Sequence, residues 1–390
     1  FEMIFPDHPY SLPVLGTIES VRGMTHERMR AFYDKHYVCN NTTVVATGDL
    51  DSDEVEAAVE ELFGDLARRQ PPERKPADRE VTQASASLIE ANFSESRLTY
   101  AFPAPNLHHQ DVPALDVLAI ILGQGDSSRL FGSIRQQDQL ANDIGCSCYT
   151  PERGGMFSVS LTTDRQRIDR AYERSLEVIA ELLANGVSGQ EVEKARNIIV
   201  AEATYKFETM QGLANSLGYY SVVCDNPNWE NDYHEAVKRV SRADVLRVAR
   251  RYLVAKGVQL VRLLGQPNDD ERVELLESEQ LLDLASKHLA ATWNTPLAAR
   301  ERDVVEGIER IRLPSGDELL AMPSFEVPVL SLRVATRGGL RTEGPADNGR
   351  STMLADLLNR GTSRRTGDEI AELVDRLAAD VSGFAGRNSI

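Results

Sequence analysis

The side chains best suited to hold a catalytic metal are the seven histidines, and their spacing decides whether they could do so. A hydrolytic zinc site needs imidazoles and a carboxylate that converge on one open tetrahedral position. No histidine stands in an HxxEH or HExxH pattern. His234-Glu235 begins such a pattern, but Lys238 lies where the second imidazole would be, so a surface helix is the better interpretation. The adjacent pair His108-His109 cannot easily chelate one ion. The sequence therefore predicts no metal site within this chain.

Other reactive groups also lack the partners that chemistry would need. Cys146 and Cys148 would share one face of a strand, but two thiols do not close a structural zinc site, so buried small apolar residues are the better interpretation. The glycine-rich stretch 123–132 lacks the Lys-Ser/Thr ending of a phosphate-binding loop, and no Gly-x-Ser-x-Gly motif is present. Paired carboxylates such as Glu60-Glu61 are typical of a solvated face. No complete active site is predicted.

Composition excludes several classes of function. The chain has 390 residues, of which 42% are hydrophobic and 26% charged, and its net charge is −17. A surface this acidic repels phosphate backbones, so we expect no nucleic-acid partner. No apolar run reaches the roughly 18 to 20 residues that a membrane helix needs. Four cysteines are too few for a disulfide scaffold. The compartment stays open: bacterial periplasm and cytoplasm are both possible.

Near the N-terminus the pattern predicts an element order of helix, strand and helix. Thr25 is expected to cap a helix that ends at Tyr37, and the β-branched run Thr42–Gly48 predicts a buried strand. Asp51 or Ser52 begins the next helix, whose buried face should contain five apolar residues: Val55, Val59, Leu62, Phe63 and Leu66. A proline-rich polar stretch then predicts a linker.

The rest of the chain mixes strands with pairs of helices. Strands are expected at 86–93, 97–102, 143–149, 155–163, 258–265 and 327–336, with a hairpin around Ser315-Gly316. Helices are expected at 112–122, 128–137, 164–185, 188–209, 213–223, 241–253, 271–293, 349–359 and 367–379. Because strict βαβ alternation is missing, the pattern favours an α+β fold with repeated lobes of mixed, largely antiparallel sheet covered by helices.

These elements predict five segments along the chain. They are the C-terminal part of a first α+β lobe (1–70), a linker (71–82), a complete second lobe (83–270), a helical linker (271–305) and the N-terminal part of a third lobe (306–390). Both chain ends resemble the interior of a domain, so we expect an internal fragment.

Several segments together resemble the pitrilysin/insulinase family of zinc metallopeptidases, which includes mitochondrial processing peptidase. They are HPYSLPVLGT (8–17), FYDKHYVCNNTTVVATGDLD (32–51), LGQGDSSRLFGSIRQQDQLA (122–141), GGLRTEGPADNG (338–349) and RGTSRRTGDEI (360–370). Their order and spacing match through nearly all of the chain. The resemblance implies two-lobed halves, one active and one degenerate, that enclose extended peptides.

The resemblance locates the metal motif and shows it to be degenerate. Counted from Gly349 and Gly361-Thr362, the HxxEH positions fall on residues 352–356, which are Thr352, Met353, Leu354, Ala355 and Asp356. The imidazoles and the general base of the inverzincin motif are absent there. An ordinary amphipathic helix packed on a sheet is the favoured interpretation. The zinc of the parent protein is therefore expected outside this chain.

Family members also hold the substrate backbone with an Arg and a Tyr seven residues apart. The matching places in this chain are Arg135 and Asn142, so the aromatic residue is missing. The alternative interpretation of Arg135 is a salt bridge on a helix surface.

The resemblance implies a part of a zinc-dependent metallopeptidase that cleaves extended peptides with metal-activated water. This stretch would supply chamber wall and inactive-half elements, and alone it is expected to be inactive. The expected partners are a peptide or unfolded-protein substrate and the other half, or a homologous subunit. A non-catalytic peptide-binding or assembly protein of the same fold is the alternative.

Overall fold

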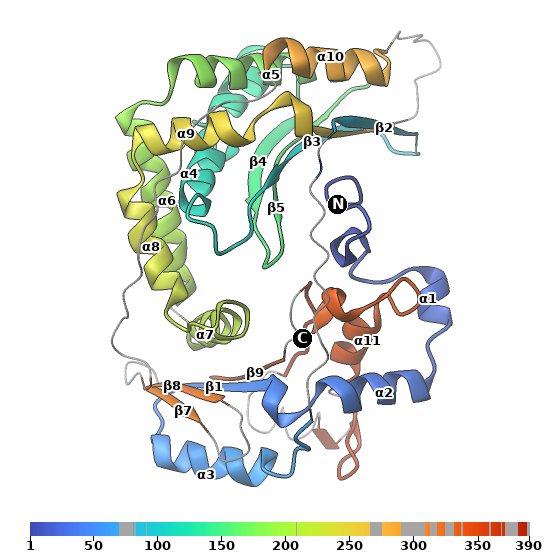
Figure 1. Cartoon of the computed structure of the whole chain (residues 1–390), viewed down its shortest axis with the longest axis vertical. Coiled ribbons are helices and arrows are strands. Elements are labelled where there is room, and N and C mark those ends of the chain that lie inside the picture. Colours follow the sequence, from blue (N-terminus) through green and yellow to red (C-terminus); the bar gives the residue numbers. More distant parts are fainter. Residues whose placement is uncertain are drawn as a thin grey trace. The chain divides into compact units, whose positions relative to one another are not determined.

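The chain folds into two compact units (Figure 1). The first contains residues 1–77, 204–231 and 303–390, and the second contains 78–203 and 232–302. The computed structural model describes residues 1–69, 81, 83–90, 92–207, 209–265, 275–289, 309–312, 318–323, 331–336, 338–358, 360–367, 369–370 and 381–387. None of the described helices combines the length and the apolarity that crossing a membrane requires.

The second unit is built on a five-stranded sheet with the order β2-β6-β3-β5-β4. Its strands are β2 (Ser85–Glu90), β3 (Ser96–Ala104), β4 (Asp143–Tyr149), β5 (Gly155–Thr163) and β6 (Gln259–Leu264). The β2–β6 pair is parallel and every other pair is antiparallel. The mixed, largely antiparallel sheet expected from the sequence is therefore confirmed, and β4 and β5 have the predicted bounds.

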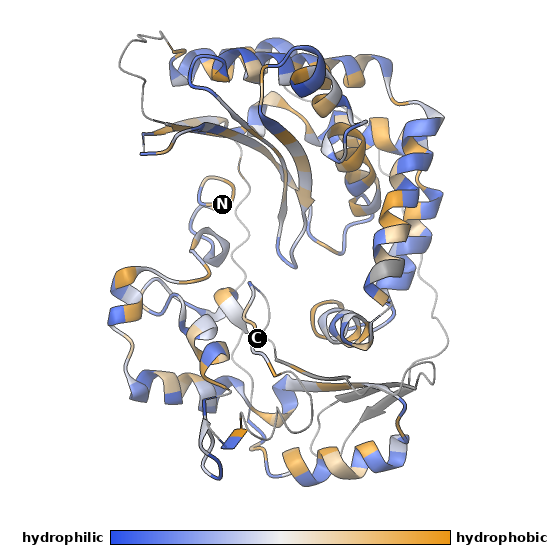
Figure 2. Ribbon diagram, turned by 180° about the vertical axis from the view of Figure 1, so that it is seen from behind, coloured by the Kyte–Doolittle hydropathy of each residue, from blue (hydrophilic) through white to orange (hydrophobic). Residues whose placement is uncertain are grey.

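Helices cover this sheet and supply most of the core. They are α4 (Val112–Gly123), α5 (Ile168–Asn185), α6 (Gly189–Phe207), α8 (Trp229–Arg239), α9 (Arg242–Tyr252) and α10 (Ser278–His288). In α4 nearly every side chain is buried, so the helix lacks a polar face and is orange along much of its length in Figure 2. Tyr100 and Phe102 of β3 are completely buried in the same core.

Local hydrogen bonds explain where two of these helices begin. Ser188 and Glu191 form a capping box at α6: the Ser188 amide donates to the Glu191 carboxylate at 2.7 Å, and the Glu191 amide donates to Ser188 Oγ at 3.2 Å. Ser241 and Asp244 form a second box at α9.

One predicted helix has a different geometry. Residues 128–137 were expected to form an ordinary α-helix, but Phe131–Gln137 is a π-helix, η3. A π-helix accommodates one more residue per turn and shifts the following side chains around the axis. The residue types alone cannot distinguish the two helices, so the prediction was wrong in geometry but not in place.

The first unit contains a four-stranded sheet with the order β7-β8-β1-β9. Its strands are β1 (Thr42–Gly48), β7 (Glu309–Arg312), β8 (Glu318–Pro323) and β9 (Ser331–Thr336). Neighbouring side chains of β1 point to opposite faces: Val44 packs on Val59 of α3 (Ser52–Phe63), and Val45 packs on Leu217 of α7 (Met210–Cys224). The sheet thus lies between α3 and α7 (Figure 1).

Three helices of the N-terminal segment belong to this unit as well: η1 (Pro9–Ser11), α1 (Ile18–Arg22) and α2 (His26–His36). Thr25 caps α2, as predicted, and Asp51 caps α3 through the amides of Asp53 and Glu54. Leu62 was expected on the buried face of α3, but 72% of it is exposed. The buried stripe of α3 is therefore narrower than its apolar pattern suggested.

Some predictions concern residues that the structure does not describe. The linker 71–82 and the linker 271–305 fall largely outside the described residues, as do the turn at Ser315-Gly316 and most of the helix 367–379. The five predicted segments stay a prediction about a longer parent protein. Within this chain, β1 pairs with β8 and β9, so residues from both of its ends contribute to one sheet.

Candidate functional site

The positions predicted to correspond to a degenerate metal motif lie in α11 (Arg350–Leu357), and a buried carboxylate caps this helix. Glu343 accepts hydrogen bonds from the amides of Gly349 and Ser351, each at 2.7 Å, and is only 5% exposed. These amides have no partner inside the helix, and a carboxylate at a helix N-terminus is also favoured by the helix dipole. The sequence analysis did not predict that Glu343 caps α11. A glutamate a few residues before a helix that begins at a glycine could have indicated this role.

The segments 8–17 and 338–349, on which the resemblance partly rests, fit against each other at the start of α11. Gly16 and Gly349 have φ angles of +80° and +91°, which glycine adopts without strain. A Cβ atom on Gly16 would lie 2.3 Å from the carbonyl oxygen of Asn348. Asn348 is completely buried and donates its side-chain amide to the carbonyl of Pro13 at 2.6 Å. Close backbone contact therefore explains both glycines.

The motif positions themselves do not fit a zinc ion. Thr352 donates its hydroxyl to the carbonyl of Val14 at 3.0 Å, Leu354 and Ala355 are buried apolar residues, and Asp356 is exposed. Hydroxyl and methyl groups are not zinc ligands of proteins, and a single exposed carboxylate cannot hold the ion. Ala355, at the position of the general base, cannot accept a proton from water. We therefore derive no metal-dependent step from α11.

The candidate substrate-binding residue Arg135 lies on η3 in the second unit. Its side chain is exposed, and the guanidinium carbon lies 4.6 Å from the centre of the Phe131 ring. No carboxylate among the described residues forms an ion pair with it. Among the described residues a cation–π contact orients the side chain. The alternative interpretation, a surface salt bridge, stays a prediction. Phe131 and Arg135 are four residues apart and therefore lie on one face of η3.

The second candidate, Asn142, is already engaged. Its side-chain amide donates to Glu95 Oε1 at 2.8 Å, and its backbone amide donates to the carbonyl of Thr162 at 2.8 Å. The side chain therefore ties the start of β4 to the turn before β3. Of the predicted pair, Arg135 makes no hydrogen bond to the described residues, whereas Asn142 is held by Glu95.

A further candidate for acid–base chemistry is Asp116 in α4. Burial raises the pKa of this carboxyl group to about 6, and hydrogen bonds from the Tyr233 hydroxyl (2.6 Å) and the Cys148 thiol partly offset that rise. Perturbed pKa values often mark active sites. In this case the partners of Asp116 are Tyr233 of α8 and Cys148 of β4, and Cys148 itself packs against the core. The arrangement is therefore structural. Cys146 and Cys148, which were predicted to be small buried residues, pack against the core but are only partly buried.

Replacing Asp116 with asparagine should remove a pH dependence of stability. The pKa of Asp116 is higher in the folded chain (about 6) than in the unfolded chain (3.8), so its contribution is most favourable below about pH 4 and is lost as the pH rises through 6. Denaturant unfolding at pH 4 to 7.5 should show D116N gaining stability relative to the native chain over this interval. A stability difference that is constant with pH would contradict this.

Comparison with known proteins gives consistent results. Residues 23–199 match the family model described as "Peptidase M16 inactive domain". An "Uncharacterized zinc protease" of Rickettsia felis is 24% identical over 277 residues, which is 69% of this chain and 64% of that protein. One of Mycobacterium leprae is 30% identical over 196 residues, 50% of this chain and 44% of that protein. The chain thus spans less than two thirds of the length of these relatives.

Solved structures share the fold. The M16 inactive domain from Pseudomonas fluorescens has a TM-score of 0.60 at 20% identity and covers 69% of this chain, which in turn covers 65% of it. A chain of "Complex III2 from Candida albicans" has a TM-score of 0.63 at 18% identity, with 73% and 68% covered. Residues 23–199 are therefore similar in sequence to the Peptidase M16 inactive domain, and the chain shares its fold with these solved structures.

Proposed function

We propose that this chain is a non-catalytic, peptide-binding part of an M16-type zinc metallopeptidase. The parent protein hydrolyses extended peptides with metal-activated water, and its zinc site lies outside this chain. The chain contributes wall and binding surface to the chamber that encloses the substrate. The observation that carries the proposal is the composition of α11, whose motif positions offer neither imidazoles nor a base while its cap and packing are intact.

Arg135 is the residue of this chain that acts on the substrate. An extended peptide exposes a row of backbone carbonyl oxygens, and a guanidinium group can donate two parallel hydrogen bonds to such acceptors. The contact with Phe131 restricts the rotamers of the arginine, which lowers the entropy lost on binding. The net charge of −17 further favours basic peptides through long-range steering.

Arg135→Ala should weaken the binding of an extended basic peptide by roughly 10-fold, because a hydrogen bond from a charged donor contributes about 1.5–3 kcal/mol. Fluorescence anisotropy with a labelled peptide, at low and high salt, measures the change. Arg242, exposed at the start of α9, offers a matched control, since R242A removes the same charge elsewhere.

Equal changes in R135A and R242A would mean that Arg135 acts through net charge alone, and unchanged binding in R135A would refute the role of Arg135. Arg135→Lys keeps the charge but not the fork of donors, so it should not restore the affinity of the native chain. With zinc added, this chain should leave a quenched reporter peptide uncleaved. Cleavage that survives removal of trace proteases would overturn the non-catalytic assignment.

A second candidate is a non-catalytic binding or assembly protein whose parent has no zinc site at all. It is favoured by a Bacillus subtilis relative named "Probable inactive metalloprotease YmfF", which is 24% identical over 249 residues, 62% of this chain and 57% of that protein. Elemental analysis of the full-length protein beside this chain alone decides between the two candidates: one zinc more in the full-length protein than in this chain supports the peptidase, and no additional zinc supports the binding protein.

A further inference from the structure

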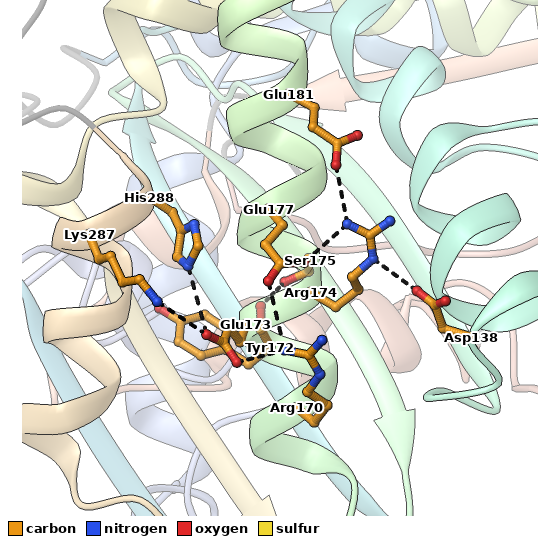
Figure 3. Close-up of polar contacts among 10 residues, drawn as sticks. All are labelled: Asp138, Arg170, Tyr172, Glu173, Arg174, Ser175, Glu177, Glu181, Lys287 and His288. Carbon is orange, nitrogen blue, oxygen red and sulfur yellow. Dashed lines mark hydrogen bonds and ion pairs between the residues drawn. The ribbon is translucent and has the colours of Figure 1, made fainter.

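Three potential metal ligands from two helices meet at the outer layer of the second unit. Glu173 and Glu177 are four residues apart on α5 and so lie on one face of it, and His288 is the last residue of α10. One ligand atom from each of the three lies within 4.8 Å of the others. Figure 3 shows the imidazole of His288 directed toward the carboxylate of Glu173. The distance from His288 Nε2 to Glu173 Oε1 is 4.0 Å.

The position of α10 on α5 is fixed independently of these ligands. Arg262 of β6, whose side chain is 3% exposed, forms an ion pair with Asp169 at 2.7 Å and donates to the carbonyl of Leu276 at 2.5 Å. Asp169 also accepts the amide of Leu276 at 2.7 Å. Leu281 and Ala285 of α10 are completely buried in the core. The three ligands therefore belong to a preorganised helix pair.

In each carboxylate of the cluster, one oxygen forms a close ion pair with an arginine, and the other oxygen makes only longer contacts. Glu173 Oε2 lies 2.8 Å from Arg170, and Glu177 Oε2 lies 3.1 Å from Arg174. Glu177 Oε1 is 3.7 Å from Arg170, and Glu173 Oε1 is 3.5 Å from Lys287, so both are outside ordinary hydrogen-bond distance. Outer-shell hydrogen bonds of this kind orient carboxylates that bind metals.

The imidazole of His288 is the second, independent indication of a ligand. Its Nε2 atom is inaccessible to solvent and has no hydrogen-bond partner, although the side chain as a whole is 14% exposed. A buried polar atom without a partner costs about 1–3 kcal/mol, so native structures rarely keep one without a reason. A neutral imidazole nitrogen with a free lone pair is the ligand that zinc prefers.

We infer that Glu173, Glu177 and His288 form a zinc-binding site that joins α5 to α10. Two carboxylate oxygens and one imidazole nitrogen supply three ligands, and water supplies the fourth. Zinc bonds of about 2.0–2.2 Å place ligand atoms roughly 3.4 Å apart, so side-chain rotations that shorten the present separations by about 1 Å suffice. The site differs in place and in ligands from the HxxEH positions of α11, and it does not depend on the proposed function.

Lys287 provides a signature that separates a metal site from a network of ion pairs. Its ammonium group is 64% exposed and shares Glu173 Oε1 with the incoming ion, so it competes with zinc. Removing it should tighten zinc binding, because the repulsion between the two cations disappears. If the cluster serves only as an ion-pair network, loss of Lys287 weakens the contact between the helices and leaves zinc binding unchanged.

The test is a titration of the purified 390-residue chain with ZnCl₂ in competition with a chromophoric chelator. We expect one zinc per chain and a rise in melting temperature on binding. His288→Ala and the isosteric Glu177→Gln should each weaken binding by more than about 100-fold, since loss of an outer-shell partner alone costs 10–100-fold. Lys287→Ala should strengthen it, and MgCl₂ should not compete, because magnesium prefers oxygen ligands.

Circular dichroism verifies that each variant is folded. Zinc bound with equal affinity by the native chain, H288A and E177Q would place the ion elsewhere, and no binding by the native chain would leave an ion-pair network only; either result overturns the site. Neither result bears on peptide binding by Arg135. Conversely, if the chain binds zinc through these residues but does not bind peptide, the proposed function is wrong and the zinc site stands.

Discussion

Replacing Asp111 with alanine is expected to lower the free energy of unfolding by roughly 3–5 kcal/mol, the range typical for breaking a buried charge pair. Asp111 is completely buried at the start of α4, where Arg247 approaches its carboxylate to 2.7 Å and the Tyr252 hydroxyl donates to it at 2.9 Å. Arg251 lies 3.6 Å away. Without the carboxylate, two arginines of α9 face each other with their counter-charge removed.

The measurement is denaturant unfolding of D111A beside D34A. Asp34 also pairs with an arginine, Arg30, but both side chains are largely exposed, so its loss should cost less than about 1 kcal/mol. Asp111→Asn keeps the shape and the acceptor for Tyr252 but not the charge. Its loss of unfolding free energy should therefore lie between those of D111A and D34A. Similar losses in D111A and D34A would show that the buried cluster contributes no more than a surface pair.

Local pattern was enough to predict most elements of this fold. The β-branched run of β1 identifies this strand residue for residue. The strands β4 and β5 have their predicted bounds because turn signals lie between them. The capping box of α6 follows from Ser188 and Glu191 in the same way. The location of a degenerate metal motif, counted from Gly349 and Gly361, stays a prediction.

Contacts between distant segments could not be predicted. The partners of Asp111 come from α9, and His288 meets Glu173 only because a buried Arg262 docks α10 on α5. A single sequence contains the residues but no information about which of its many carboxylates each arginine or histidine will face. The π-helical geometry of η3 and the exposure of Leu62 likewise depend on packing, not on local preference.

Gly123 shows how such packing constrains one position. It is the last residue of α4, and a Cβ atom there would lie 2.2 Å from the backbone nitrogen and 2.8 Å from the Cα atom of Cys146 in β4. Real Cβ contacts are never this short, and the atoms in the way are backbone atoms of a strand paired with β5. Neither can move aside by changing a rotamer, so the helix and the strand would have to separate.

Gly123→Ala should therefore destabilise the chain by about 3 kcal/mol or more, at or above the upper end of the 1–3 kcal/mol typical of overpacking, although alanine is the better helix former. Gly132→Ala is the matched control: it lies in η3, nothing lies within 4 Å of its Cβ position, and the substitution should be neutral or slightly stabilising. Thermal and denaturant unfolding of both variants compares them directly. If G123A were as stable as G132A, the close approach of α4 to β4 would not exist in solution. The contact of Cys148 with Asp116 would then be wrong as well, because it depends on the same approach of helix and strand and contributes to the pKa of Asp116.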